Sequence, residues 1–93
     1  MEKVYFNGKE YQIGKLLVED TKILQKDKMK YKMDEIDYSY YFIWYVIDKF
    51  NPGIFKDQKE FENSGIEGFG NLQSQILKIT GYDQYFSSGI GKK

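Results

Sequence analysis

Residues 36–50 read IDYSYYFIWYVIDKF, and about half of these positions are aromatic, including the only tryptophan, Trp44. Aromatic and β-branched side chains also favour strands. The run over 35–50 is nevertheless too long for a typical strand of about five or six residues, and it suits a helix of roughly four turns. Asp34 can cap the N-terminus, and Asn-Pro-Gly at 51–53 ends the helix because proline cannot continue the hydrogen-bond ladder. We therefore predict a central helix over residues 35–50.

This helix would carry two stripes of side chains, because residues three or four apart lie on the same face. The first stripe is apolar or aromatic and consists of Ile36, Tyr40, Ile43, Ile47 and Phe50. We expect it to form the core. The second stripe mixes rings with carboxylates and consists of Asp37, Tyr41, Trp44 and Asp48. The sequence leaves open whether the second stripe completes the core or forms an interface.

Residues 3–14, KVYFNGKEYQIG, have the pattern of a β-hairpin. Apolar or aromatic residues alternate with polar ones on both sides of Asn7-Gly8, the dipeptide best suited to the positive φ angles of a type I′ turn. Gly14 is expected to end the second strand. The hairpin is the clearest local pattern in the chain.

The segment between the hairpin and the central helix is less regular. Residues 17–26 predict a short amphipathic helix, because apolar positions recur at i, i+4 and i+7 and acidic residues occupy the first turn. Over 27–33, lysines alternate with Met and Tyr. As a strand this stretch would have one basic face, and as a helix it would have none, so we expect a variable connection. Its lysines suit either a solvated face or a contact with phosphate or an acidic partner.

Two further helices are predicted in the second half of the chain. Residues 56–63 form a short charged segment, and residues 71–80 repeat apolar positions at helical spacing before Gly81, a suitable C-terminal residue. Residues 88–93 end in small residues and lysines, so we expect a mobile tail. The whole chain, 1–93, is thus predicted to be a single α+β domain, in which an N-terminal β-hairpin is followed by three or four helices packed around the central aromatic helix.

The composition excludes several kinds of chemistry. Lys and Arg total 14, as do Asp and Glu, so the formal net charge is zero and no global field favours nucleic acid or an anionic membrane. The chain has no Cys, His or Arg. It therefore lacks histidine, the commonest general base, and both histidine and cysteine, the commonest zinc ligands. It also lacks arginine, which binds phosphate or guanine through two hydrogen bonds. We predict no catalytic residues, no metal site and no cofactor.

Two glycine-rich stretches resemble phosphate loops only superficially. GIEGFG at 65–70 follows no predicted strand and lacks the Lys-Ser/Thr of a P-loop, and GIGKK at 89–93 has no hydroxyl residue after its lysine. We interpret the first as a loop between helices.

The remaining candidates for function are aromatic residues that could contact a protein. The predicted partner-binding residues are Tyr41, Trp44, Tyr45, Asp48, Tyr82, Tyr85 and Phe86. Rings that carry a polar group are enriched at protein interfaces. Weak charge repulsion leaves self-association open. No apolar run approaches the roughly 20 residues that a membrane span needs, so we expect a cytoplasmic protein.

The order of these elements resembles a known family. NGKEYQIGKL (7–16), then VEDTKIL, then an aromatic helix ending in DKFNPGIFKDQKEFENSG, and finally LQSQILKITGY are similar to the short tail assembly chaperones of long-tailed bacteriophages that infect low-GC Gram-positive hosts. In that family an apolar passage containing Gly, Phe and Glu lies between the long helix and the last one. The residues in that role here are Phe50, Pro52, Gly53, Phe55, Glu60 and Phe61.

The resemblance implies a non-enzymatic assembly factor in the cytoplasm of a bacterial host. Such a factor binds the tape-measure protein, helps to recruit tail-tube subunits and is absent from the finished virion. An alternative is a small phage- or plasmid-encoded inhibitor that blocks a host defence protein by direct binding. Both hypotheses expect a protein partner, and neither requires nucleic acid or a membrane.

Overall fold

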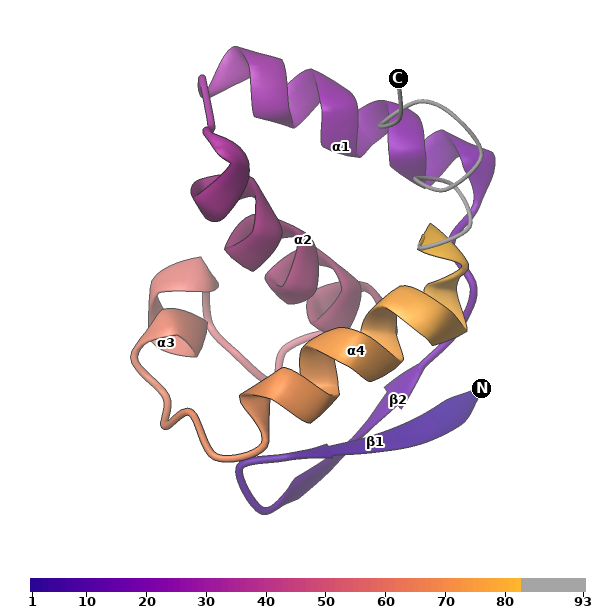
Figure 1. The fold of residues 1–93 in the computed structure, drawn as a ribbon, viewed down its shortest axis with the longest axis vertical. Coiled ribbons are helices and arrows are strands. Elements are labelled where there is room, and N and C mark those ends of the chain that lie inside the picture. Colours follow the sequence, from indigo (N-terminus) through magenta and orange to yellow (C-terminus); the bar gives the residue numbers. More distant parts are fainter. Residues whose placement is uncertain (83–93) are drawn as a thin grey trace.

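The computed structural model describes residues 1–82, in which two strands are followed by four helices. The elements are β1 (Glu2–Phe6), β2 (Lys9–Ile13), α1 (Val18–Lys30), α2 (Glu35–Phe50), α3 (Gln58–Glu62) and α4 (Phe69–Thr80). Figure 1 shows α1 across one end of the molecule and the hairpin at the other, with α2 and α4 between them. The prediction of an α+β fold with an N-terminal hairpin is therefore confirmed.

The hairpin forms as its sequence predicts. Strands β1 and β2 pair antiparallel with Val4 opposite Tyr11, and the turn residues Asn7 and Gly8 have φ angles of 57° and 79°. Because side chains alternate across a strand, one face of the hairpin is buried. The buried residues on this face are Val4, Phe6, Tyr11 and Ile13. The hairpin thus supplies one wall of the core.

Hydrogen bonds from the loops hold the hairpin against the helices. The side chain of Asn51 accepts a hydrogen bond from the Gln12 amide at 2.9 Å and donates one to the Gln12 carbonyl at 2.8 Å. These bonds pair both backbone polar groups of Gln12 at the outer edge of β2. The Asn7 amide donates to the Glu67 carbonyl, and the Leu16 amide donates to the Thr80 carbonyl. The ends of the hairpin are therefore tied to the ends of α2 and α4.

The central helix has the predicted bounds. Asp34 accepts a hydrogen bond from the Asp37 amide at 2.7 Å, and the helix ends at Phe50, before Asn51. The ring of Phe50 packs close to Gly14, where a Cβ atom would lie 2.9 Å from the Phe50 Cε1 atom. A larger residue directly after β2 would therefore require the Phe50 ring to shift.

The predicted core stripe of α2 is wrong at its N-terminal end. Ile43 and Ile47 are buried, but Ile36 is 68% exposed and Tyr40 is 42% exposed. The first turns of α2 lie away from the hairpin, next to the end of α1 (Figure 1). The helix is instead covered by α1 on one side and α4 on another, so its buried face is wider than one stripe. The buried residues of α2 are Tyr38, Tyr41, Phe42, Ile43, Val46 and Ile47.

Helix α1 is longer than predicted. It continues to Lys30, so the expected variable connection at 27–33 is wrong for its first four positions. Lysine and methionine are good helix formers, and α2 supplies partners for the polar side chains of this turn. The connection to α2 is short: Lys32 has a φ of 52°, and the Met33 amide donates to the Lys28 carbonyl at 3.0 Å.

The last two helices lie close to their predicted positions. Helix α3 falls within the predicted 56–63, and α4 begins two residues before the predicted 71–80. Gly68, with a φ of 78°, turns the chain into α4, and Gly81, with a φ of 84°, ends it. The predicted tail at 88–93 lies outside the described residues.

We expect Asn51→Ala to lower the free energy of unfolding by about 1–3 kcal/mol, because it removes the bonds to Gln12 and to the Ile47 carbonyl. Urea denaturation followed by tryptophan fluorescence would measure the change. Asn63→Ala is a matched control, since the exposed Asn63 side chain makes no hydrogen bond within residues 1–82, and it should change the stability by less than about 0.5 kcal/mol. Equal effects of the two substitutions would contradict a role for Asn51 in docking the hairpin.

Candidate functional site

Two of the predicted partner-binding residues, Tyr41 and Tyr45, lie between α1 and α2. The Tyr45 hydroxyl donates to Oδ1 of Asp20 at 2.7 Å, and the Tyr41 hydroxyl donates to Oδ2 of Asp27. Each phenol comes from α2 and each carboxylate from α1. These hydroxyls therefore attach α1 to α2 within the chain.

Asp20 is the most buried charged residue of this contact, with 4% of its surface exposed. Besides Tyr45, its carboxylate accepts from the Leu17 amide at 2.8 Å, and Lys49 Nζ lies 3.1 Å away. Burial alone would raise the pKa of Asp20, but the three donors outweigh it and hold the pKa below its ordinary value of 3.8. Asp20 is therefore ionised and fully paired at neutral pH.

The phenols respond in the opposite direction. Burial raises the pKa of Tyr41, and its hydrogen bond to Asp27 raises it further. Burial likewise raises the pKa of Tyr45, together with its bond to Asp20. Both rings remain neutral donors at physiological pH, so their chemistry is that of a structural hydrogen bond.

The other predicted partner-binding residues do not form one exposed patch with these two. Trp44 and Asp48 are half-buried, and the indole Nε1 of Trp44 is buried without a hydrogen-bond partner in the described part of the chain. Tyr82 is buried; its ring stacks on Phe42 at 4.3 Å between centroids, and its hydroxyl lies 2.6 Å from that of Tyr38. Tyr85 and Phe86 lie outside the described residues.

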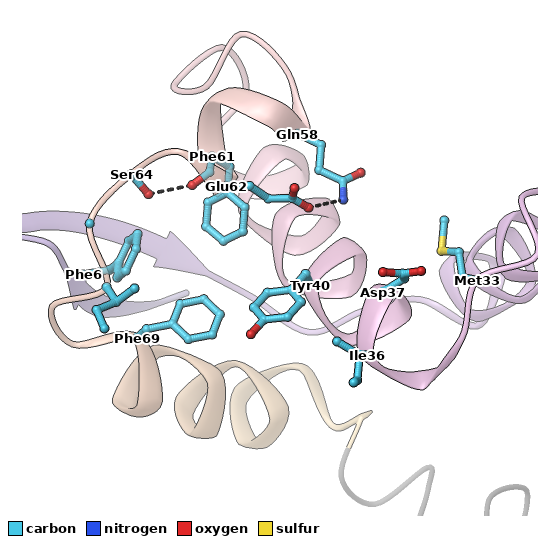
Figure 2. A pocket seen from close by; sticks show the side chains of 12 residues that line it. Phe6, Met33, Ile36, Asp37, Tyr40, Gln58, Phe61, Glu62, Ser64 and Phe69 are labelled. Atoms are coloured by element: carbon cyan, nitrogen blue, oxygen red, sulfur yellow. Dashed lines mark hydrogen bonds between the residues drawn. The ribbon is translucent and has the colours of Figure 1, made fainter.

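The structure instead has an open pocket on another face of α2, which we call the α2–α3 pocket (Figure 2). Its volume is about 560 Å³, within the range of ligand pockets. The lining residues are Phe6, Met33, Ile36, Asp37, Tyr40, Gln58, Phe61, Glu62, Ser64, Gly65, Ile66 and Phe69. They come from β1, from the α1–α2 connection, from the first half of α2, from α3, from the loop after α3 and from the first residue of α4.

Aromatic rings form the wall of the pocket that faces the core. Phe6, Phe61 and Phe69 lie 6.0–6.3 Å apart between ring centroids. Tyr40 stacks on Phe69 at 5.7 Å and joins this cluster to α2. Phe6 and Phe61 are fully buried, so the cluster is continuous with the hydrophobic core.

The mouth of the pocket is partly apolar and partly acidic. Ile36 and Ile66 stand at the mouth, and Ile66 is 85% exposed. Asp37 on α2 and Glu62 on α3 are both exposed, and no lysine of residues 1–82 lines the pocket. The Gln58 side chain donates to Glu62 at 2.7 Å, as drawn in Figure 2. The pocket therefore offers apolar contact inside and negative charge at its edge.

Sequence reasoning missed this pocket. Ile36 and Tyr40 carry the right signal, an apolar stripe at the start of the central helix, but that stripe reads equally well as core. The pocket exists because the 64–68 loop folds beside β1, where the Asn7 amide bonds to the Glu67 carbonyl. No local pattern predicts that contact. Within residues 1–82, no group of three or more acidic side chains is placed to hold a metal ion.

We expect the Asp20 contact to make part of the stability depend on pH. Since the folded pKa of Asp20 is lowered, its contribution is complete above 3.8 and is lost as the pH falls through the lower, folded value. The difference in unfolding free energy between the parent chain and Asp20→Asn should be constant from about pH 7 to 5 and should shrink below about pH 4. Urea denaturation at each pH would measure it.

A second variant separates the hydrogen bond from the charge. Tyr45→Phe removes one donor to Asp20 and should cost about 1–3 kcal/mol at pH 7. Tyr5→Phe removes an exposed bond to Glu10 and serves as the control. For Asp20→Asn, a difference in unfolding free energy from the parent chain that does not change with pH would contradict a lowered pKa of Asp20 in the folded state.

No family model, no curated protein and no solved structure matches this chain. Among the described residues, no helix is both long and apolar enough to cross a membrane. The case for a function therefore rests on the residues of the chain itself and on the arrangement of its surface.

Proposed function

We propose that this chain is a non-enzymatic phage tail assembly chaperone, which binds the tape-measure protein and helps to recruit tail-tube subunits in the bacterial cytoplasm. The observation that carries a binding role is the α2–α3 pocket, where core-like side chains remain open to solvent. An exposed apolar surface with a polar edge is typical of a protein interaction site.

The partner-binding role follows from what the pocket contains. Ile36, Tyr40 and Ile66 expose apolar surface at one place, beside the buried rings of Phe6 and Phe61. Covering such surface is favourable by roughly 25 cal/mol per Å² of apolar area removed from water. Exposure of this apolar surface to water does not stabilise the domain. A partner that covers the surface is therefore the simplest explanation for its exposure.

The more specific role in tail assembly is supported by the order of elements. The chain has an opening hairpin with Asn7-Gly8 at its turn, then a long aromatic helix and a final helix that ends at Gly81. The phage tail assembly chaperones, which the sequence resembles, have their elements in the same order. The passage between the two helices carries Phe55 and Phe61, whose rings meet edge to face at 5.4 Å. This passage connects α2 to the pocket wall.

Co-expression with the tape-measure protein of the same genome tests the proposal. The two chains should co-purify, and the soluble yield of the tape-measure protein should rise several-fold over expression alone. The variant Ile47→Asp places a charge in the core and should abolish the effect by unfolding the chaperone, which shows that the folded domain is needed. A tape-measure protein that is equally soluble alone and never co-purifies would contradict the proposal.

A further inference from the structure

We propose that the α2–α3 pocket also takes a second copy of this chain, through the patch at the C-terminal end of α1 formed by Met29, Lys30, Tyr31 and Lys32, which we call the 29–32 patch. The contact would be between two different surfaces, pocket on one copy and patch on the next. It goes beyond the proposed function, because it requires neither the tape-measure protein nor any other phage component.

The shape of the core favours an apolar partner at the start of α2. The stripe on α2 runs from the half-buried Phe50 through the buried Ile47 and Ile43 to the exposed Tyr40 and Ile36. Ile36 and Tyr40 therefore stand where the core would continue if another apolar side chain were supplied. The α2–α3 pocket has room for such a side chain, with a volume of about 560 Å³.

The edge of the pocket carries negative charge. Asp37 and Glu62 stand on opposite elements at the edge of the pocket, and neither forms an ion pair in the part of the chain that the structure describes. Lys59, on α3 with Glu62, forms none either within residues 1–82. A side chain that enters between two carboxylates is best accompanied by a cation, because opposite charges across an interface stabilise it and orient the partner. The pocket thus favours an apolar group flanked by lysine.

The 29–32 patch has this chemistry. Met29 is 78% exposed and Tyr31 is 61% exposed, which leaves two large apolar side chains on the surface. Lys30 and Lys32 alternate with them, and neither forms an ion pair among residues 1–82. Lys30 Nζ lies 5.3 Å from the centroid of the Tyr31 ring, so the charge and the ring are presented together. Methionine adapts its shape readily to an irregular pocket.

Two of the other strongly exposed apolar side chains fit less well. Ile66 belongs to the pocket itself and precedes Glu67, and Val18 precedes Glu19 and Asp20. An acidic neighbour would be repelled by Asp37 and Glu62. The zero net charge of the chain removes the overall repulsion that would keep copies apart. Among residues 1–82, Lys28 bonds Glu35 at 2.9 Å, whereas Lys30 and Lys32 form no ion pair and are available to a partner.

The test is a complementation experiment on the full chain. Sedimentation velocity and light scattering from about 10 µM to 1 mM should give a mass above the 11.1 kDa of one chain, and about 0.5 M NaCl should reduce it. Ile36→Glu, which blocks the pocket, and Met29→Glu with Tyr31→Glu, which blocks the patch, should each weaken association about tenfold or more. Both sites are exposed, so melting temperatures should not change.

An equimolar mixture of the two blocked variants gives the decisive result. Each variant keeps the surface that the other has lost, so the mixture should form heterodimers although each variant alone is monomeric. Lys30→Gln with Lys32→Gln should weaken association by up to about fivefold per charge. Ile54→Glu, an exposed isoleucine outside the pocket, is the matched control and should associate like the parent.

Other outcomes would overturn the proposal and remain distinct from the test of function. A parent chain that is monomeric throughout, or blocked variants that fail to complement each other, would exclude the pocket–patch contact. A monomer that loses the tape-measure protein on Ile36→Glu would assign the pocket to that partner instead. An oligomer that shows the predicted complementation without binding the tape-measure protein would retain this contact and refute the chaperone role.

Discussion

Packing of the middle and last turns of α2 against the hairpin and α4 is the contact on which the remaining structure depends. Ile43, Val46 and Ile47 are buried there with Phe6 and Ile13 of the hairpin. A two-stranded hairpin is at best marginally stable in water, and an isolated helix of this length is also marginal. Each element is stabilised by covering the other, at about 1.5–3 kcal/mol for each large apolar side chain that is fully buried. The hydrogen bonds of Asn51, Leu16 and Asn7 then set how the hairpin lies on the helices.

Helix α1 is attached by a different kind of interaction. Only Leu24 and Asp20 of this helix are buried, and the contact with α2 depends on carboxylates that receive phenol hydrogen bonds. Such bonds are directional and lose strength when the carboxylate is protonated, whereas the apolar core does not respond to pH. Tyr41 and Tyr45 therefore have a structural use that explains why their rings are partly polar. The position of α1 matters for the surface, because the 29–32 patch spans the end of this helix and the residues that lead to Met33 in the pocket.

The parts of the fold that the sequence predicts are those determined by local chemistry. Asn7-Gly8 defines the hairpin turn, Asp34 and the 51–53 stop define α2, and Gly81 ends α4. The errors arise where partners distant in sequence decide the outcome. Residues 27–30 are helical because Asp27 and Lys28 find Tyr41 and Glu35 on α2, which periodicity cannot show. The same holds for the site. Tyr41 and Tyr45 are predicted to bind a partner, and their hydroxyls instead hold α1. Ile36 and Tyr40 are predicted to lie in the core, and they line the pocket.

The apolar stripe of α2 passes from the core at Ile47 and Ile43 to an open surface at Tyr40 and Ile36. Methyl NMR of the full chain with a soluble paramagnetic agent measures this directly, since relaxation of each isoleucine methyl group reports its access to solvent. At a concentration where the chain is monomeric, the Ile36 and Ile66 methyl groups should relax strongly, and those of Ile43, Ile47 and Ile76 should be protected. An Ile36 methyl group as protected as that of Ile43 would mean that the pocket is closed in the free chain and that the apolar stripe of α2 stays in the core.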